Sequence, residues 1–183
     1  TYMGRTLTRV LVHSQDPDTL WCASSLGVYR SVNGGDNWIR TLTGDYASLE
    51  SDPSDPDHLL AGEFGNHVAE SFDAGATWSV QSLDGSSFGI SRIALAFAPS
   101  APDTVYALAG KNSDQGFAGC WRSIDGGSTW SPRMLEEEGP NLLGWTVDGS
   151  DPGGQAWYDL CMAVHPEDAE QLFIGGGNLW GST

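Results

Sequence analysis

The 183-residue sequence predicts an all-β fold built of repeated, four-stranded antiparallel sheets. The first observation is an eight-residue phrase that occurs three times, as SVNGGDNW at 31–38, SFDAGATW at 71–78 and SIDGGSTW at 123–130. Short apolar runs with the alternation of half-buried strands flank each copy. The second observation is that no segment sustains the 3.6-residue apolar period of an amphipathic helix.

A second phrase recurs upstream of each copy and once more near the end of the chain. It reads RVLVHSQDPDTLWCAS from Arg9, ASLESDPSDPDHLLAG from Ala47, IALAFAPSAPDTVYAL from Ile93 and CMAVHPEDAEQLFIGG from Cys161. Its middle is predicted to be a turn, because proline presets φ and aspartate hydrogen-bonds its own backbone. Four short strands in a unit of about 40 to 50 residues are the sequence pattern of a β-propeller blade.

The repeats predict a single partial β-propeller over residues 1–183, with about three and a half blades. The blade repeats are expected at about 8–43, 46–82, 92–133 and 158–183, with a long insertion loop at 131–158. The final NLWGST corresponds to GVYRSV and GCWRSI, so the chain stops inside a repeat. A ring usually has more blades. We therefore expect the remaining blades from the same or another chain, and insoluble or oligomeric material when residues 1–183 are expressed alone.

The eight-residue phrase, called the box below, is predicted to be a structural turn. Glycine permits φ > 0, the carboxylate accepts turn N–H groups, and the tryptophan returns a large apolar side chain to the core, where we expect it largely buried. Asn33 in the first copy keeps the acceptor oxygen but loses the charge, which suits a turn and not a general base. The box residues are Ser31, Asn33, Gly35, Trp38, Ser71, Asp73, Gly75, Trp78, Ser123, Asp125, Gly127 and Trp130.

The three boxes resemble Asp-box repeats, also called BNR repeats. These occur in β-propellers of sialidases, xyloglucan-hydrolysing enzymes, sortilin-type receptors and a photosystem assembly factor. The segments SRIALAFAPSAPDTVYAL, LLGWTVDGSDPGGQAWYDL and LFIGGGNLWGST look closer to secreted Bacteroidetes-type Asp-box proteins, which often end in a type IX secretion sorting domain. The resemblance implies a secreted or cell-surface protein, of which this chain is a fragment.

No catalytic residue is predicted. SRIAL at 91–95 lacks the proline of the sialidase Arg-Ile-Pro motif, and Ser25 in SSLGVYR stands where xyloglucanases of the Asp-box type have a catalytic aspartate. Serine cannot replace a member of the carboxylate pair that glycoside hydrolysis needs. A glycoside hydrolase of the xyloglucanase or sialidase type, with its acids partly outside this fragment, stays open as the alternative function.

Charge and cysteine usage exclude further classes of function. With 24 acidic and 8 basic residues, the formal net charge is −16, which disfavours nucleic acid and anionic membranes as partners. No apolar run approaches the roughly 20 residues of a membrane span. Cys22, Cys120 and Cys161 lie in apolar, strand-like runs and are predicted to be buried free thiols, with one disulfide as the alternative. No metal site or cofactor is predicted, although DGSD at 148–151 could contribute oxygens to Ca²⁺.

The longest connections are predicted to lie on the rim opposite the boxes, at 62–70, 80–91, 108–119 and 131–158. Aromatic side chains beside carboxylates and amides suit sugar stacking or a protein contact, and the alternative is that they pack the loop onto the sheets. The candidate ligand-facing residues are Trp145, Asp148, Asp151, Gln155, Trp157, Tyr158, Asn66, His67, Asn112 and Asp114. The leading function is a secreted or cell-surface, non-catalytic propeller that binds glycan or protein.

Overall fold

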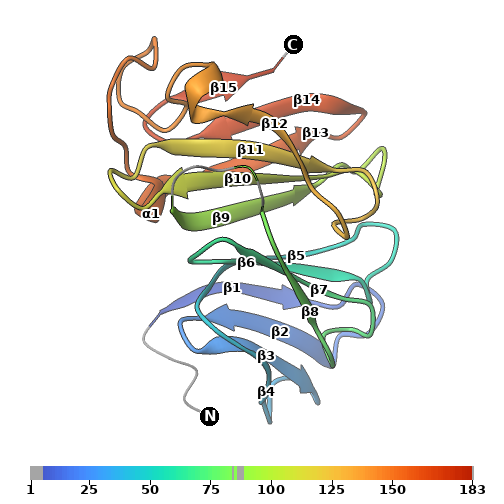
Figure 1. Ribbon diagram of the computed structural model, residues 1–183. Coiled ribbons are helices and arrows are strands. Elements are labelled where there is room, and N and C mark those ends of the chain that lie inside the picture. Colours follow the sequence, from blue (N-terminus) through green and yellow to red (C-terminus); the bar gives the residue numbers. More distant parts are fainter. Residues whose placement is uncertain (1–5, 84, 86–88, 183) are drawn as a thin grey trace.

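The computed structural model describes residues 6–83, 85 and 89–182. Four antiparallel sheets follow one another in chain order (Figure 1). The strands are β1 (Leu7–Val12), β2 (Thr19–Ser24), β3 (Gly27–Val32), β4 (Ile39–Thr43), β5 (Tyr46–Ser51), β6 (Leu59–Glu63), β7 (His67–Ser71), β8 (Ser79–Ser82), β9 (Ile90–Phe97), β10 (Val105–Lys111), β11 (Phe117–Ser123), β12 (Ser131–Leu135), β13 (Cys161–His165), β14 (Asp168–Gly175) and β15 (Leu179–Gly181). The first three sheets have four strands each and the last has β13, β14 and β15. The predicted all-β, partial propeller is confirmed.

Two connections that were predicted to be long, at 62–70 and 108–119, are short in the structure, because the strands on both sides extend into them. Only residues 64–66 separate β6 from β7, and only 112–116 separate β10 from β11. Residues 131–135, predicted within the insertion loop, instead form β12, in which Ser131 pairs with Arg122 and Leu135 with Gly119. Pro132 is tolerated because β12 is an outer strand, where a missing N–H breaks no central ladder. The long connection therefore runs from 136 to 160, with a 3₁₀ turn η1 (Glu136–Glu138) and one helical turn α1 (Ala156–Asp159).

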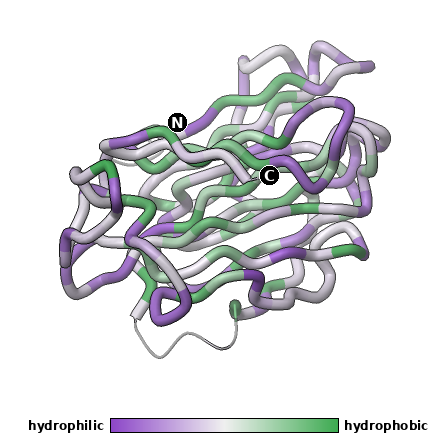
Figure 2. The backbone as a smooth tube through the Cα atoms, turned by 90° about the horizontal axis from the view of Figure 1, so that it is seen from above, coloured by the Kyte–Doolittle hydropathy of each residue, from purple (hydrophilic) through white to green (hydrophobic). Residues whose placement is uncertain are grey.

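The hydrophobic core lies between the sheets, because successive residues of a strand face opposite sides. In β6, Leu59 packs toward the first sheet and Leu60 toward the third. Figure 2 shows apolar residues along the strands and hydrophilic ones concentrated in the connections. The two fully buried tryptophans, Trp21 in β2 and Trp121 in β11, come from middle strands.

The three box tryptophans are partly buried and are more exposed than Trp21 and Trp121. Each directly precedes an outer strand, and Trp78 and Trp130 pack against the core cluster that their own sheet shares with the preceding one. Trp78 shows the arrangement: its Nε1 donates to Thr41 Oγ1 of β4 at 3.1 Å and to Gly75 O at 3.2 Å. An indole at the margin keeps one side open to solvent.

The polar atoms of each box hold its own turn. Asp73 Oδ1 accepts the Thr77 N–H at 2.8 Å, Asp125 Oδ1 accepts the Thr129 N–H at 2.8 Å, and Asn33 Oδ1 accepts the Asn37 N–H at 2.9 Å. The Thr77 hydroxyl also donates to Asp73 and, with these backbone bonds, lowers the pKa of that carboxyl to about 2. These are the contacts that a structural turn requires.

A backbone hydrogen bond also joins each box to the proline/aspartate turn of its own sheet. The backbone N–H groups of Gly34, Ala74 and Gly126 donate to the carbonyls of Asp18, Asp57 and Asp103, at 3.0, 2.9 and 2.9 Å respectively. Both kinds of turn thus share one end of the sheets, called the box rim below. The connections 64–66, 112–116 and 136–160 lie at the other end, called the opposite rim.

The cysteines differ from expectation at one position. Cys22 and Cys120 are buried free thiols, and burial raises the pKa of Cys120 to about 12, which makes its thiol unreactive. Cys161 is free but exposed. The pairing of β13 with β14 places Cys161 on the same face as Phe173, which is turned away from the third sheet. Within the described residues, no helix is long and apolar enough to cross a membrane.

Candidate functional site

The connection from 136 to 160 is anchored by Asn141, a residue that sequence reasoning missed. Asn141 Oδ1 accepts the N–H of Phe117 at 2.8 Å, and Nδ2 donates to the carbonyls of Asp151 and Gly153 at 3.0 and 2.9 Å. One side chain therefore ties the start of β11 to both halves of the connection. Leu142 and Leu143, which follow it, are buried between the third and fourth sheets.

Lys111 adds a second anchor from the end of β10. Its buried ammonium lies 2.9 Å from Asp114 Oδ2 and also pairs with Glu136 Oε1. Burial alone would lower the pKa of Lys111, but the bonds to Glu136 and Asp114 outweigh it and raise that pKa. Asp114, predicted to face a ligand, is thus engaged in holding the 112–116 and 136–160 connections together.

The two aspartates of the DGSD segment shape the loop that contains Trp145. Asp151 Oδ2 accepts the backbone N–H groups of Trp145 and Thr146, the latter at 2.6 Å. Asp148 is exposed and accepts the Ser150 N–H at 3.1 Å, and the bonds from Ser150 and Thr146 lower its pKa. These carboxylates serve the loop itself. Within the part of the chain that the structure describes, no group of three or more His, Cys, Asp or Glu side chains could hold a metal ion.

Trp145 is presented at the side of the fourth sheet. Asn178, in the turn between β14 and β15, donates from Nδ2 to the carbonyls of Gly144 and Thr146 at 3.2 and 3.0 Å. The backbone on both sides of Trp145 is therefore fixed, while its side chain is 54% exposed.

Trp157 and Tyr158 project from α1 into solvent. Their side chains are 58% and 71% exposed, and their ring centroids lie 5.4 Å apart with an interplanar angle of 55°. The turn is held down by Ala156, which is fully buried against Gly110. A Cβ at position 110 would lie 2.1 Å from the Ala156 Cβ, so only glycine permits this approach.

Arg92 positions α1 from β9. Its Nη1 donates to the carbonyls of Ala156, Trp157 and Tyr158 at 3.4, 3.3 and 3.2 Å. A cation at these carbonyls complements the negative end of a helical turn. The same guanidinium lies over the Phe64 ring, 5.8 Å from its centroid, so Arg92 also links α1 to the 64–66 connection. No sequence motif marked Arg92 for this role.

The remaining predicted residues lie in or beside the 64–66, 112–116 and 136–160 connections. Backbone bonds from Gly154 to Asp114 and from Ala156 to Gln115, both 3.0 Å, join the segment that contains Gln155 to the 112–116 connection. Asn112 is exposed and its N–H donates to Gly89 O at 2.7 Å. In the 64–66 connection, the Asn66 carbonyl accepts the Leu83 N–H at 2.9 Å, and beside it His67 Nδ1 lies 2.6 Å from Glu63 Oε2.

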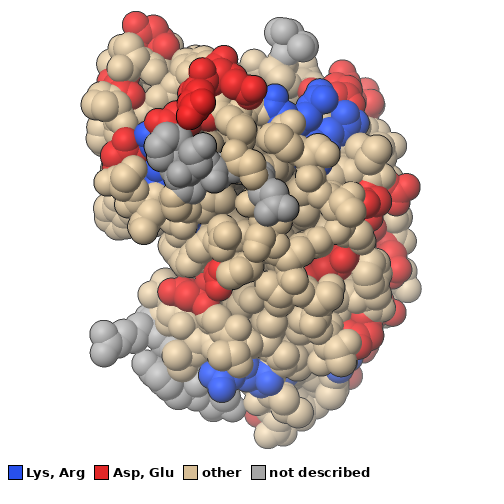
Figure 3. Space-filling view, in the orientation of Figure 1, with Lys and Arg blue, Asp and Glu red and all other residues tan. Residues whose placement is uncertain are grey.

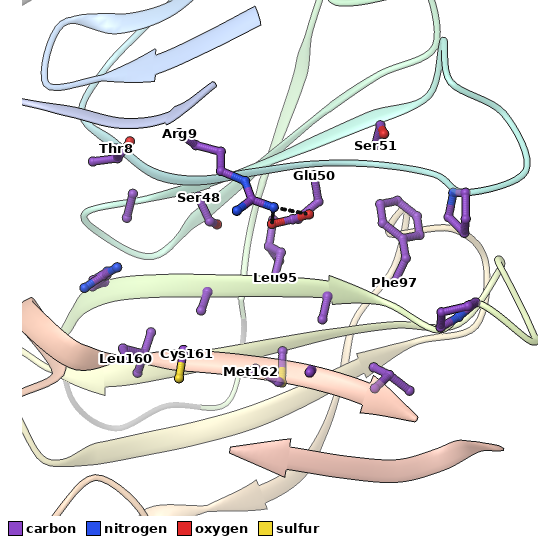
Figure 4. A pocket seen from close by; sticks show the side chains of 18 residues that line it. Thr8, Arg9, Ser48, Glu50, Ser51, Leu95, Phe97, Leu160, Cys161 and Met162 are labelled. Atoms are coloured by element: carbon purple, nitrogen blue, oxygen red, sulfur yellow. Dashed lines mark hydrogen bonds and ion pairs between the residues drawn. The ribbon is translucent and has the colours of Figure 1, made fainter. Parts of the chain in front are cut away.

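A groove of about 510 Å³, which sequence reasoning also missed, runs between the inner strands β1, β5, β9 and β13 (Figure 4). Its wall from β1 and β5 is polar, and Arg9 Nη2 pairs there with Glu50 Oε1 at 3.1 Å. Burial raises the pKa of Glu50 despite that arginine. The wall from β9 and β13 is largely apolar, with Leu95 and Met162 among its side chains, although Arg92 also lines it.

None of the three cavities described below has two carboxylates among its described lining residues. Glu50 is the one carboxylate among the described residues that line the groove, and Glu170 is the one that lines a cavity of about 360 Å³ between the third and fourth sheets. A third, smaller cavity between the first two sheets has none among its described lining residues. Hydrolysis by either stereochemical route needs two carboxyl groups across the scissile bond.

Comparison with known proteins shows the fold and no more. The sequence matches no family model and no curated protein. Among solved structures, it is similar to an ancestral GH74 enzyme, with a TM-score of 0.69, 19% identity, and coverage of 95% of this chain and 22% of that one. It is similar to the β-propeller domain of Cps50 (Swd1) from Myceliophteria thermophila, with a TM-score of 0.56, 14% identity, and coverage of 97% and 54%. It is also similar to YCF48 from Cyanidioschyzon merolae, with a TM-score of 0.55, 16% identity, and coverage of 96% and 55%.

The chain thus spans about a fifth of the GH74 enzyme and about half of the other two structures. One of these proteins is an enzyme, and the names of the other two do not describe one. Their activities do not pass to this chain at 14–19% identity. Membership of the Asp-box family and of its Bacteroidetes-type group stays a prediction. What the comparisons show is that this chain has the fold of part of a β-propeller.

Proposed function

We propose that the protein is a non-catalytic binding propeller, secreted or at the cell surface, that holds a glycan or protein ligand on its opposite rim. The observation that carries the proposal is the exposure of Trp145, Trp157 and Tyr158 on backbone that is fixed by hydrogen bonds. Large aromatic side chains on fixed backbone give contact area at a low cost in conformational entropy, and they are enriched at binding hot spots. The secreted location rests on the resemblance of the boxes alone.

The alternative that these aromatics merely pack the loop has little support. The side chains that bury the connection are Leu142, Leu143, Ala156 and Leu160, which are all at most 9% exposed. The three aromatic rings are more than half exposed, so they contribute little to the core. Their placement favours contact with something outside the chain.

The charge of the rim adds a constraint on the ligand. Glu137, Glu138 and Asp148 are exposed on the same connection as the aromatics. Acidic side chains outnumber basic ones on the face shown in Figure 3. An anionic ligand would be repelled, so neutral glycans and neutral or basic protein surfaces are favoured.

The hydrolase alternative would require a second carboxylate near a cavity. Each described cavity has at most one carboxylate among its described lining residues, and both are paired with arginine: Glu50 with Arg9, and Glu170 with Arg122. The alternative therefore needs at least one catalytic acid from outside the described lining of these cavities. Binding needs no further residue, because Trp145, Trp157 and Tyr158 are already exposed.

Replacing Trp157 with alanine is expected to weaken ligand binding by about 1–3 kcal/mol, because truncation of an aromatic anchor at a contact centre has that effect. The melting temperature should hardly change, since the ring is mostly in solvent. A glycan array and a panel of extracellular proteins would identify the ligand, and titration calorimetry would compare the variants.

The matched control is Ile124→Ala, which removes an apolar side chain that is 71% exposed on the box rim. It should leave affinity unchanged. If Ile124→Ala weakens binding and Trp157→Ala does not, the ligand lies on the box rim. If Trp157→Ala unfolds the protein, its ring is a packing element and the proposed site is wrong.

A further inference from the structure

The box rim carries a row of exposed apolar side chains at equivalent positions of the three boxes. The second residue of each box is Val32, Phe72 or Ile124, and these residues are 57%, 65% and 71% exposed. The serine that precedes each of them is buried, so the second side chain points outward by the alternation of an extended chain. Single exposed apolar residues are ordinary in proteins, but repetition of one position along one rim indicates an interaction surface.

The turn of the box does not require these apolar side chains. Its bonds come from the serine hydroxyl, the aspartate or asparagine oxygen and backbone N–H groups; for example, Ser71 Oγ accepts the Gly75 N–H at 2.9 Å. Strand formation does not account for the side chains either, because β7 ends at Ser71 and β11 ends at Ser123. Phe72 and Ile124 therefore lie beyond their strands, with most of their surface available to another molecule.

The three side chains lie on neighbouring boxes that contact the sheet before them. Val32 and Ala76 of the second box line one cavity of about 160 Å³ between the first two sheets. Phe72 stacks on His58 with ring centroids 4.6 Å apart, and a Cβ at Gly126 of the third box would lie 3.0 Å from His58 Cε1. The row thus crosses three adjoining sheets.

Acidic side chains surround this row. The boxes and proline/aspartate turns of the first three sheets hold eight exposed aspartates and no lysine or arginine. Arg30 and Arg122, one residue before two of the boxes, are partly buried, and Arg122 is paired with Glu170. Figure 3 shows acidic side chains recurring down the right-hand edge of the molecule. The segments counted are 13–18, 32–37, 52–58, 72–77, 98–104 and 124–129.

We propose that the box rim of the first three sheets is a docking surface for a basic polypeptide segment in the polyproline II conformation, with an apolar side chain at every third position. This conformation has three residues per turn and a rise of about 3.1 Å per residue, so side chains three residues apart share one face about 9 Å apart. Packed sheets lie about 10 Å apart, which matches that spacing.

The charge of the rim selects the sign of the partner. The apolar side chains of the segment contact the row, and the lysine or arginine residues between them lie against the surrounding aspartates. Complementary charges speed association and exclude acidic partners. This surface is distinct from the opposite rim and does not depend on the function proposed there.

The probe is a labelled nonapeptide with leucine at its second, fifth and eighth positions and arginine elsewhere. One control peptide has the same composition with its three leucines adjacent, and another has glutamate in place of arginine. Fluorescence anisotropy with the 183-residue chain is expected to show saturable binding of the probe, and at least about tenfold weaker binding of both controls. Raising NaCl from about 0.05 to 0.5 M should weaken binding, because exposed charges are screened.

The three peptides separate the two parts of the proposal. Equal binding of the probe and the peptide with adjacent leucines would overturn the role of the apolar row. Equal binding of the glutamate peptide would overturn the role of the aspartates. Absence of saturable binding of the probe would overturn the docking surface as a whole.

Variants of the chain locate the contact. Ile124→Ser should weaken binding of the probe at least about fivefold. The matched control is Leu7→Ser, which changes a residue that is 57% exposed where β1 begins, at the other end of the sheet. It should leave binding unchanged. The pair Asp18→Asn and Asp36→Asn, at two exposed carboxylates, should weaken binding and reduce its dependence on salt.

Far-UV circular dichroism should be the same for all these variants, because the changed side chains are exposed. An equal loss of binding for Leu7→Ser and Ile124→Ser would overturn the assignment to the box rim. Trp157→Ala should leave binding of the probe unchanged, and a loss there would place the probe on the opposite rim and overturn the proposal. Failure of this surface is thus distinguishable from failure of the opposite-rim site.

Discussion

Replacing Trp21 with alanine is expected to lower the free energy of unfolding by about 3–5 kcal/mol, the range for truncating a buried tryptophan. Trp21 is fully buried between the first and second sheets, and its Nε1 donates to Ala74 O at 2.6 Å. A Cβ at Gly75 would lie 2.8 Å from that nitrogen, which shows how closely the second box packs on the indole. Truncation leaves a cavity and an unpaired carbonyl. Urea denaturation followed by circular dichroism measures the change.

The matched control is Trp38→Ala, which truncates a half-buried box tryptophan. Its ring is more exposed than that of Trp21, so less buried apolar surface is lost and the cost in unfolding free energy should be clearly smaller. If the two variants lose the same stability, burial in the middle strands is not what distinguishes them, and the box indoles would be the principal core elements.

Replacing His58 with alanine is expected to cost about 3–5 kcal/mol, because it removes one partner from a buried charged network. His58 is 4% exposed; its Nδ1 lies 3.1 Å from Asp52 Oδ2 and its Nε2 lies 3.3 Å from Glu70 Oε1. The ring also stacks on Phe72 with centroids 4.6 Å apart. Ser128, from the third box, donates to both oxygens of Glu70, so the network joins two sheets. Removing the imidazole leaves two carboxylates without their shared donor.

The stabilisation by His58 should depend on pH. Burial alone would lower its pKa, but the hydrogen bonds and negative charges of Glu70 and Asp52 outweigh it, so the folded-state pKa is raised. A group whose pKa is raised on folding stabilises fully below its unfolded pKa, about 6.5, and loses that contribution as the pH rises through the folded pKa. The difference in unfolding free energy between wild type and His58→Gln should therefore shrink as the pH is raised from about 5.5 to 9. A constant difference across that window would mean that the pKa of His58 does not change on folding, and a difference that grows with pH would mean that the imidazole is neutral in the folded protein.

Much of the fold could be predicted because its determinants are local in sequence. The bond from the Thr77 N–H to Asp73 spans four residues, and the corresponding bonds of the other two boxes have the same spacing. Local spacing can be read directly from residue identities, and its repetition at blade length identified the architecture. The position of the opposite rim followed from that architecture, because both kinds of short turn lie at the other end of the sheets.

The parts that could not be predicted depend on contacts between distant segments. Which tryptophans are fully buried depends on which strands lie in the middle of the packed sheets. The residues next to Trp21 and next to Trp38 do not show that the first is more buried than the second. The anchors of the candidate surface are similarly remote: Arg92 and Tyr158 are 66 positions apart, and Asn141 and Phe117 are 24 apart. No sequence period connects such pairs, so the aromatic side chains could be named from the sequence while the residues that position them could not.

The bonds between each box and its proline/aspartate turn have a consequence for how this protein can change over evolutionary time. The three N–H groups of Gly34, Ala74 and Gly126 fix strand alignment at one end of their sheets. The exposed residues 145–148 of the 136–160 connection take no part in that alignment, so substitutions there are free of the constraint that holds the sheets in order. Selection can therefore diversify the segment that contains Trp145 and Trp157 while the scaffold stays the same. A library randomised at 145–148 and displayed on this chain would yield new binders without a new fold, because Gly144, Gly149 and Asp151 keep the shape of the loop.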